Sequence, residues 1–311
     1  MQCAGSISFA RHLSLQHARW ENALASHDGA GPDGLPRVDG FQLERRIGEG
    51  RLATTFLARD LERGGRVVLK MLRRDLATSP ARVAAFEREY AVPAALRHPH
   101  VVRVFGHSVM EGRPYMTMEY LGGGDLAGLL RSGLLPQEAV ALLRQASEAV
   151  AQLHRDGIAH CDVKPANLLL RHSGDLVLAD FGAARQIGAP APASAGQIVG
   201  TPSHAAPELA HGGAASAAAD IYSLGVVFHE MLCGRLPFPG RTLMEVVCQH
   251  LMAPIPRLPQ SLARFQSLVD AMLEKQADRR LADGQELLAR IDSLEGAPAP
   301  TLALVGADDI R

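Results

Sequence analysis

The chain has 311 residues, of which 47% are hydrophobic and 21% charged, an ordinary globular composition with room for two lobes. Its formal net charge is −1 at pH 7, so nothing in the composition predicts attraction to nucleic acid or to an anionic membrane. No apolar run approaches the roughly 20 residues that span a bilayer, and the N-terminus lacks the pattern of a signal peptide. We therefore expect a cytoplasmic enzyme with no membrane span.

The cysteines do not suggest a disulfide framework or a zinc site. They stand at positions 3, 161, 233 and 248, with no C-x-x-C pair, and the histidines form no H-E-x-x-H motif.

Residues 1–40 are expected to be an N-terminal extension and linker. Within 1–28, Leu13, Trp20 and Leu24 have near-heptad spacing, which allows either a short amphipathic helix or a loosely docked tail. Residues 29–40 are rich in turn-forming residues, so the folded domain is expected to begin near Phe41.

The next hundred residues predict a sheet with one helix. Residues 41–71 read as three strands, followed by a helix over 80–97 with proline at its start. Strands over 101–107 and 115–120 would complete a five-stranded sheet. A longer helix over 136–156 has apolar residues along one broad face.

Two glycines lie in the first turn of this sheet. Gly48 and Gly50 have no side chain, so backbone N–H groups there could approach phosphate oxygens. A G-x-G sequence is equally typical of a plain hairpin turn, and this pattern alone leaves both interpretations open.

Residues 158–182 carry the strongest chemical signal. Apolar segments 168–170 and 176–178 flank a turn, which predicts a short hairpin with polar residues at its ends. The hairpin would bring Asp162, Lys164, Asn167 and Asp180 near one another. Carboxylate and amide oxygens suit a hard divalent cation, and a lysine suits an anion, so the segment indicates magnesium and phosphate.

Several motifs in order resemble those of eukaryotic-like protein kinases. H-C-D-V-K-P-A-N followed by D-F-G is similar to the catalytic and magnesium loops, and G-T-P-S-H-A-A-P-E is similar to the family's substrate platform. The chain most resembles the bacterial Hanks-type serine/threonine protein kinases. The resemblance implies an α+β, bilobal protein-kinase fold. Residues 41–121 would form an N-lobe with a small five-stranded antiparallel sheet plus the αC helix, residues 122–295 a larger, mainly helical C-lobe, and residues 296–311 a tail.

The resemblance also implies a nucleotide site for ATP. V-V-L-K places Lys70 to hold phosphates, with Glu89 orienting it. The family's adenine, ribose and phosphate contacts map onto the following residues: Gly48, Gly50, Thr55, Val68, Lys70, Glu89, Met118, Glu119, Leu121, Asp125 and Leu169.

The implied reaction is phosphoryl transfer to Ser/Thr hydroxyls of protein substrates, with autophosphorylation. Asp162 would orient the substrate hydroxyl and accept its proton, Lys164 would neutralise the γ-phosphate, and Thr201 would join the substrate platform to both. Asn167 and Asp180 would hold Mg²⁺, for which Mn²⁺ could substitute. For the structural residues, Asp220 is expected to brace the catalytic loop, and Glu208 and Arg280 to form a buried ion pair.

The sequence departs from the family pattern at several positions. Thr55 and Val68 replace the usual valine and alanine around adenine, which predicts a tighter pocket roof, and Pro93 predicts a kink or early end of its helix. Cys161 replaces the arginine that usually reads a phosphate on the activation loop. Because Ser194 is the only hydroxyl residue between Gly182 and Thr201, we expect that loop phosphorylation is not the main switch.

Alternatives remain at this point. The chain could be a catalytically weak or dead kinase fold that acts as a signalling binding module, or a small-molecule kinase. Cys161 could be a redox switch or simply a small buried residue. A regulatory partner, or dimerisation through the N-lobe, is also possible.

Overall fold

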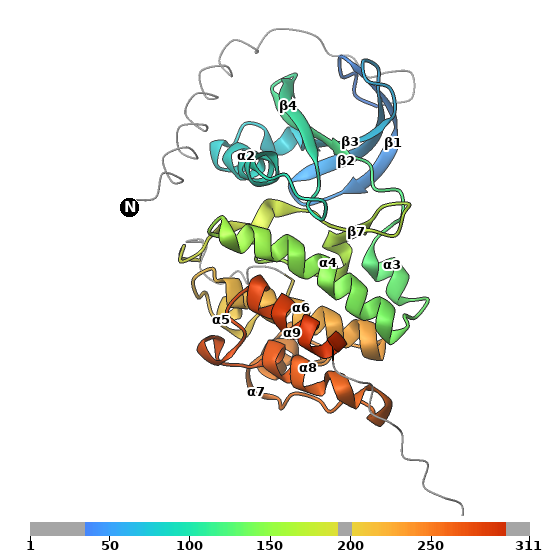
Figure 1. Ribbon diagram of the computed structural model, residues 1–311. Helices are drawn as coiled ribbons and strands as arrows, with labels where there is room; N and C mark the ends of the chain where they lie inside the picture. Colours follow the sequence, from blue (N-terminus) through green and yellow to red (C-terminus); the bar gives the residue numbers. More distant parts are fainter. Residues whose placement is uncertain (1–34, 192–200, 297–311) are drawn as a thin grey trace, which may run out of the picture. The chain divides into compact units, whose positions relative to one another are not determined.

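A computed structural model describes residues 35–191 and 201–296, which form two compact units (Figure 1). The first unit runs to Gly122 and includes Asp180–Gly182. The second unit contains Gly123–Ala179 and the chain from Ala183 onward. The expected helix within residues 1–28 and the tail beyond residue 296 lie outside the described residues.

The first unit is built on a five-stranded antiparallel sheet, as predicted, in the order β1-β2-β3-β5-β4. Its strands are β1 (Phe41–Glu49), β2 (Ala53–Asp60), β3 (Arg66–Leu72), β4 (Val104–Met110) and β5 (Arg113–Glu119). β4 begins three residues later than predicted. Val101 and Val102 are buried, at 3% and 4% exposure, but precede the strand. An apolar run alone cannot distinguish a buried loop from a strand.

The two faces of the sheet are covered by different residues, as strand alternation requires. On one face, Phe56, Leu69 and Tyr115 belong to one buried cluster. On the other, Leu72 and Met116 pack with Phe86 of helix α2 (Pro80–Ala95). Because side chains two residues apart share a face, Lys70 lies on the side of the sheet that α2 covers.

The packed core extends further toward the N-terminus than the sequence predicted. Val38 is 5% exposed, forms a β-bridge with Phe41 and belongs to the first buried cluster, against which Leu35 also packs. The sequence did not predict this contribution to the core, because residues 29–40 are rich in turn formers and a single buried valine gives no hydrophobic periodicity.

Pro93 lies within the last turn of α2, which ends at Ala95, two residues earlier than predicted. The N–H of Leu96 donates to the Pro93 carbonyl at 3.3 Å, closing the final turn. Proline has no N–H to continue the helical pattern, so its position beside the end of the helix agrees with the expected early termination.

The second unit is mainly helical and also carries short strands and 3₁₀ turns (Figure 1). Its helices are α3 (Leu126–Leu130), α4 (Pro136–Arg155), α5 (Pro207–Ala210), α6 (Ala217–Cys233), α7 (Leu243–Met252), α8 (Gln266–Leu273) and α9 (Gly284–Gly296). Its strands are β6 (Ile158–Ala159), β7 (Leu168–Leu170), β8 (Leu176–Leu178) and β9 (Arg185–Gln186). The broad apolar face predicted for α4 is buried, and α6 is buried along most of its length.

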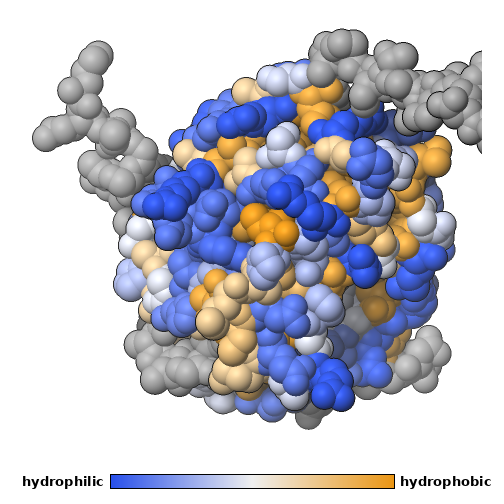
Figure 2. Space-filling model, turned by 90° about the horizontal axis from the view of Figure 1, so that it is seen from below, coloured by the Kyte–Doolittle hydropathy of each residue, from blue (hydrophilic) through white to orange (hydrophobic). Residues whose placement is uncertain are grey.

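α7 is the helix with the most exposed apolar side chains in the described second unit. Leu243, Met244 and Met252 are 56%, 70% and 84% exposed. Figure 2 shows one face of the molecule, on which hydrophobic residues form small groups among hydrophilic ones. Among the described residues, no helix is long and apolar enough to cross a membrane.

Candidate active site

The segment after β6 is fixed by a buried carboxylate on α6. Asp220 is fully buried, and it accepts hydrogen bonds from the backbone N–H groups of His160 at 2.7 Å and Cys161 at 2.8 Å. The Nε2 atom of His154 lies 3.0 Å from the same carboxylate. Cys161 has a left-handed φ of 63°, which costs free energy in a residue with a side chain. The two backbone hydrogen bonds hold this conformation, which confirms the expected bracing role of Asp220.

Asp162 lies at the centre of a hydrogen-bonded group with Lys164 and Thr201. Lys164 Nζ lies 2.7 Å from Asp162 Oδ2 and 2.7 Å from Thr201 Oγ1. The Thr201 hydroxyl in turn donates to Asp162 Oδ1 at 3.0 Å. Both carboxylate oxygens are therefore held in place, and the Asp162 and Lys164 side chains remain 14% and 22% exposed.

Asn167 joins this group through its amide nitrogen. Nδ2 donates to the Asp162 carbonyl at 2.9 Å and to Oδ2 at 3.1 Å. Both of these bonds use the amide nitrogen, and neither uses the amide oxygen. The β7–β8 hairpin has the predicted pairing, and Ala179 N–H donates to the Asn167 carbonyl at 2.9 Å. This bond fixes the residue immediately before Asp180.

Cys161 is a small buried residue, with 3% exposure and its thiol 3.7 Å from the Ala159 carbonyl. Burial raises the pKa of the Cys161 thiol to about 12, and Asp220 adds to this effect while Arg185 opposes it. Burial is the larger cause, and Asp162 contributes less than Asp220. A thiol of this kind is a poor nucleophile at neutral pH.

Lys70 on β3 forms an ion pair with Glu89 on α2 and lies 3.5 Å from Asp180 Oδ1. Burial alone would lower the pKa of Lys70, but the two carboxylates raise it above its ordinary value. Burial also raises the pKa of Glu89, against the opposing effect of Lys70. Asp180 has a φ of 62°, so backbone strain is present at this carboxylate as well.

The turn between β1 and β2, which contains Gly48 and Gly50, is positioned relative to Lys70 by the pairing of the strands. Gly48 pairs with Thr55, and Thr55 pairs with Lys70 across the next strand. A Cβ atom on Gly48 would lie 3.7 Å from the Thr55 Cβ. The N–H of Gly50 donates to the Ala53 carbonyl at 2.8 Å and closes the turn.

Val68 and Met118 are paired across β3 and β5, and both side chains are partly buried. The next residue, Glu119, uses its backbone N–H to bond the Arg103 carbonyl at 2.9 Å. This N–H is therefore used within the first unit. Leu121 is 9% exposed.

Asp125 is the N-cap of α3, and its Oδ1 accepts from the Gly128 N–H at 2.7 Å. Asp125 also forms a β-bridge with Leu169 on β7. Gly123 lies close to this strand, and a Cβ atom there would lie 2.7 Å from the Leu170 carbonyl oxygen. Asp125 and Leu169 are thus brought together, while one Asp125 oxygen already has a helix-capping role.

The segment after Thr201 is anchored by two side-chain pairs. His204 Nε2 lies 3.2 Å from Glu230 Oε2. Arg280 binds Glu208 through two nitrogens, at 2.8 and 3.1 Å, and its side chain is fully buried. The expected Glu208–Arg280 ion pair is confirmed.

Sequence reasoning missed two side chains that contact this region. His154 accepts the Gly284 N–H on Nδ1 at 3.1 Å while its Nε2 faces Asp220, so it links α9 to α6. Arg185 lies beside Cys161. A histidine at the end of a helix and an arginine in a two-residue strand leave no distinctive sequence pattern.

Other possible sites in the described part of the chain are limited. Within residues 35–191 and 201–296, no group of three or more His, Cys, Asp or Glu side chains is placed to hold a metal ion.

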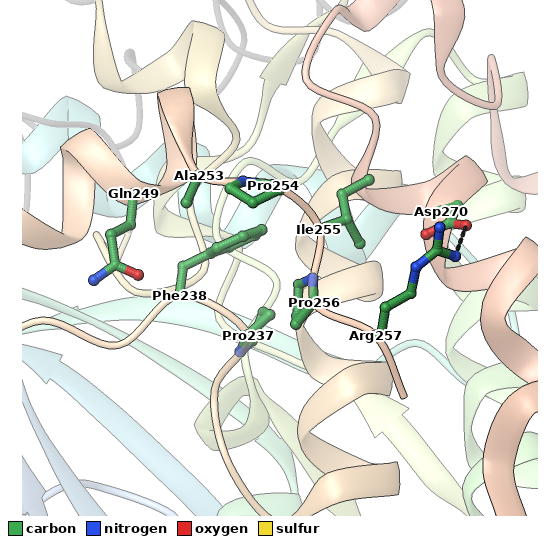
Figure 3. Close-up of a pocket in the computed structure, with 9 residues that line it drawn as sticks. All are labelled: Pro237, Phe238, Gln249, Ala253, Pro254, Ile255, Pro256, Arg257 and Asp270. Carbon is green, nitrogen blue, oxygen red and sulfur yellow. Dashed lines mark ion pairs between the residues drawn. The ribbon is translucent and has the colours of Figure 1, made fainter. Parts of the chain in front are cut away.

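The second unit has a separate open pocket (Figure 3). At one end of it, the charged atoms of Arg257 and Asp270 form an ion pair at 3.9 Å. Phe238, Ile255 and three prolines supply its apolar lining, and none of the predicted site residues contributes to it.

Comparison with known proteins agrees with this fold. The protein kinase domain model matches residues 41–290. The chain is 32% identical to the serine/threonine-protein kinase PknA of Corynebacterium glutamicum, covering 89% of this chain and 61% of the relative. It is 34% identical to PknA of Mycobacterium tuberculosis, over 78% of this chain and 58% of that relative. It is also 34% identical to PrkC of Bacillus subtilis, over 71% of this chain and 34% of that relative.

The chain belongs to the protein kinase domain family, among relatives that are bacterial serine/threonine kinases of the Hanks type. It spans between about a third and three-fifths of the length of these three relatives.

Proposed function

We propose that the chain transfers the γ-phosphoryl group of ATP to serine or threonine hydroxyls of protein substrates. The hydrogen-bonded group of Asp162, Lys164 and Thr201 is the observation that carries this proposal. Asp162 can accept a proton, Lys164 carries a positive charge, and the Thr201 hydroxyl connects both to the segment that begins at Thr201. The relatives are named as serine/threonine-protein kinases.

Asp162 and Lys164 would act on the substrate side of the reaction. The substrate oxygen forms a bond to the γ-phosphorus, the bond from that phosphorus to the β,γ-bridging oxygen breaks, and ADP leaves. Asp162 orients the hydroxyl and accepts its proton, and Lys164 offsets charge on the transferred group. Because Thr201 holds both side chains, its contact would position them before substrate binds.

In the first unit, Lys70 would hold the α- and β-phosphates. The buried Glu89 carboxylate fixes the position of the Lys70 ammonium group. Gly48 is aligned with Lys70 across the sheet, because both pair with Thr55, and without a side chain it would let a phosphate approach the backbone. Around the base we propose Val68, Met118 and Leu121 as apolar contacts, with the Glu119 carbonyl as an acceptor. Thr55, Asp125 and Leu169 would complete the nucleotide contacts.

Asn167 and Asp180 are suited to hold a divalent cation. The nitrogen of Asn167 is bonded to Asp162, so its amide oxygen would be the atom that binds the cation, and the Asp180 carboxylate is 46% exposed. These hard oxygen donors fit Mg²⁺, with Mn²⁺ as a possible substitute. When bound, the cation would offset the negative charge of the phosphates. Since ATP is abundant in the cytoplasm, the proposal places the catalytic domain there.

The test uses the purified chain with ATP and magnesium chloride. We expect phosphate to appear on serine or threonine of the chain itself and of added protein substrates, as measured by phosphopeptide mass spectrometry. Asp162→Asn should bind ATP normally and lose transfer. A wild-type chain that binds ATP without any transfer would contradict the proposal and support the binding-module alternative.

A further inference from the structure

Lysine is rare in this chain. Of the 32 lysine and arginine residues, only three are lysines, namely Lys70, Lys164 and Lys275. The first two belong to the candidate active site. Arginine stays charged in proteins, whereas lysine can lose its proton when it is buried. A chain that uses arginine for nearly all its positive charges therefore keeps a single lysine, Lys275, outside the active site.

Lys275 follows α8 and binds the C-terminal end of α7. Its Nζ donates to the His250 carbonyl at 2.8 Å and lies 3.5 Å from the Gln249 carbonyl oxygen. The ammonium group also lies 3.6 Å from the centre of the Phe238 ring and 3.4 Å from the hydroxyl oxygen of Tyr222 on α6. A positive charge is favourable here, because carbonyl oxygens gather at the C-terminus of a helix and the face of an aromatic ring attracts cations.

The groups that hold this ammonium are uncharged carbonyls, a hydroxyl and a ring. Burial lowers the pKa of Lys275 to about 8, Arg280 adds to this effect, and Glu274 opposes it. At pH 7.5 roughly a quarter of Lys275 is therefore neutral, compared with about 0.1% of a lysine with the ordinary pKa of 10.5. Because the neutral amine is the nucleophilic form of lysine, Lys275 is poised to react near neutral pH.

The amine lies close to the open pocket of the second unit. Two of its partners, Phe238 and Gln249, also line that pocket (Figure 3). Lys275 itself is only partly buried. A small electrophile in the pocket would therefore meet the residues that hold the amine.

We propose that Lys275 is an acylation site, at which a small activated acyl group removes the positive charge that holds the end of α7. The neutral amine attacks the carbonyl carbon of an acyl phosphate or an acyl thioester. A C–N bond forms, the bond from that carbon to the phosphate oxygen or the thioester sulfur breaks, and the leaving group takes the electron pair. The nitrogen loses one proton to water. The resulting amide is neutral, so it loses the cation–π contact and the charge at the helix terminus.

The experiment measures initial rates of acetylation of the purified full chain from about pH 6.5 to 9.5, and it requires no kinase activity. Acetyl phosphate is the donor in one arm and acetyl-CoA in the other. Peptide mapping by mass spectrometry follows Lys275. Arg257→Lys supplies a matched reference amine in the same unit, because the side chain at position 257 is 84% exposed. The same rates in urea report on Lys275 without its folded surroundings.

We expect the rate at Lys275 to level off above about pH 8, while the rate at position 257 of Arg257→Lys keeps rising about tenfold per pH unit. At pH 7.5, Lys275 should react at least about tenfold faster, because its larger neutral fraction outweighs the protection by partial burial. In urea the two rates should be similar. Reaction with only one donor identifies the class of donor that the site takes. A Lys275 rate that still rises tenfold per pH unit at pH 9.5, or no reaction with either donor, would overturn the proposal.

Two variants test the consequence for α7. Lys275→Gln resembles the neutral amide, and Lys275→Arg keeps the positive charge. By hydrogen exchange, the backbone amides of α7 should exchange about fivefold faster in Lys275→Gln than in the wild type, and the acetylated wild type should resemble Lys275→Gln. Lys275→Arg should stay closer to the wild type. Equal exchange of α7 in the unmodified wild type, the acetylated wild type and Lys275→Gln would overturn the role of this charge.

Discussion

The hydroxyl of Thr201 accepts a hydrogen bond from Lys164 Nζ at 2.7 Å and donates one to Asp162 at 3.0 Å. Removing it should leave both charged groups less well positioned. We expect Thr201→Ala to lower kcat by about tenfold to a hundredfold, the range for a lost hydrogen bond to a charged group. Initial rates at saturating ATP measure this effect.

Thr201→Ser is the matched control, because it keeps the hydroxyl and removes only a methyl group. It should retain most of the wild-type kcat, and both variants should bind ATP with wild-type affinity. Equal losses in the alanine and serine variants would show that the hydroxyl is not the important group.

Asp162→Asn preserves the shape of the side chain but removes the proton acceptor and its charge. We expect turnover to fall by about 10²–10⁴-fold, the usual contribution of a general base. ATP affinity should change little. Calorimetric titration with ATP and a phosphate-transfer assay on the same preparation separate the two effects. Retention of wild-type autophosphorylation would contradict the assignment of Asp162.

Much of this site could be predicted because its residues are close in sequence. Asp162, Lys164 and Asn167 lie on one short segment, and the β7–β8 hairpin that follows is encoded by two apolar runs and a turn. The distant pair Glu208 and Arg280 was accessible only through the family resemblance. No local pattern joins residues so far apart in the chain.

The remaining features depend on individual side-chain positions. β6 and β9 have only two residues each, too few to show a strand pattern, so Arg185 could not be placed beside Cys161. The use of the Gly50 and Glu119 N–H groups within the protein likewise depends on loop geometry. Composition and periodicity do not specify either of them.

Asp220→Ala should destabilise the fold strongly. The carboxylate is fully buried and accepts bonds from His160, Cys161 and His154, all of which would lose a partner. We expect the free energy of unfolding to fall by about 3–5 kcal/mol, as for other broken buried charged networks. Asp220→Asn keeps one acceptor oxygen and should lose less. Urea unfolding of the wild type, Asp220→Ala and Asp220→Asn measures these free energies of unfolding. A decrease below about 1 kcal/mol in Asp220→Ala would contradict the bracing role of Asp220.

Val68→Ala tests the predicted crowding around adenine. Val68 is partly buried opposite Met118, so truncation removes apolar contact and leaves a small cavity, at a cost on the order of 1 kcal/mol. If valine crowds the base, ATP affinity should nevertheless increase or stay constant. Calorimetric titration decides this question, and a clear weakening would show that Val68 packs on the nucleotide without strain.

The cysteines should differ in reactivity. Cys248 is exposed, whereas Cys161 is buried with a thiol pKa of about 12. At pH 8, iodoacetamide should therefore modify Cys248 at least about a hundredfold faster than Cys161 in the folded chain. Peptide mapping by mass spectrometry gives both rates, and unfolding in urea should bring them together. Comparable rates in the folded chain would favour the redox-switch interpretation.

The same thiol should make stability depend on pH at the alkaline end. Its pKa rises from 9.0 to about 12 on folding, so the unfolded chain releases the proton first. The stabilising contribution of the neutral thiol is complete below pH 9 and is lost progressively as pH rises from 9 toward 12. At pH 10.5 the loss should be about 2 kcal/mol relative to pH 8. Cys161→Ala removes this titrating group while the other groups remain. Between pH 8 and 10.5, the free energy of unfolding of Cys161→Ala should therefore fall less than that of the wild type. Parallel curves of unfolding free energy against pH would show that the thiol has the same pKa in the folded and unfolded chain.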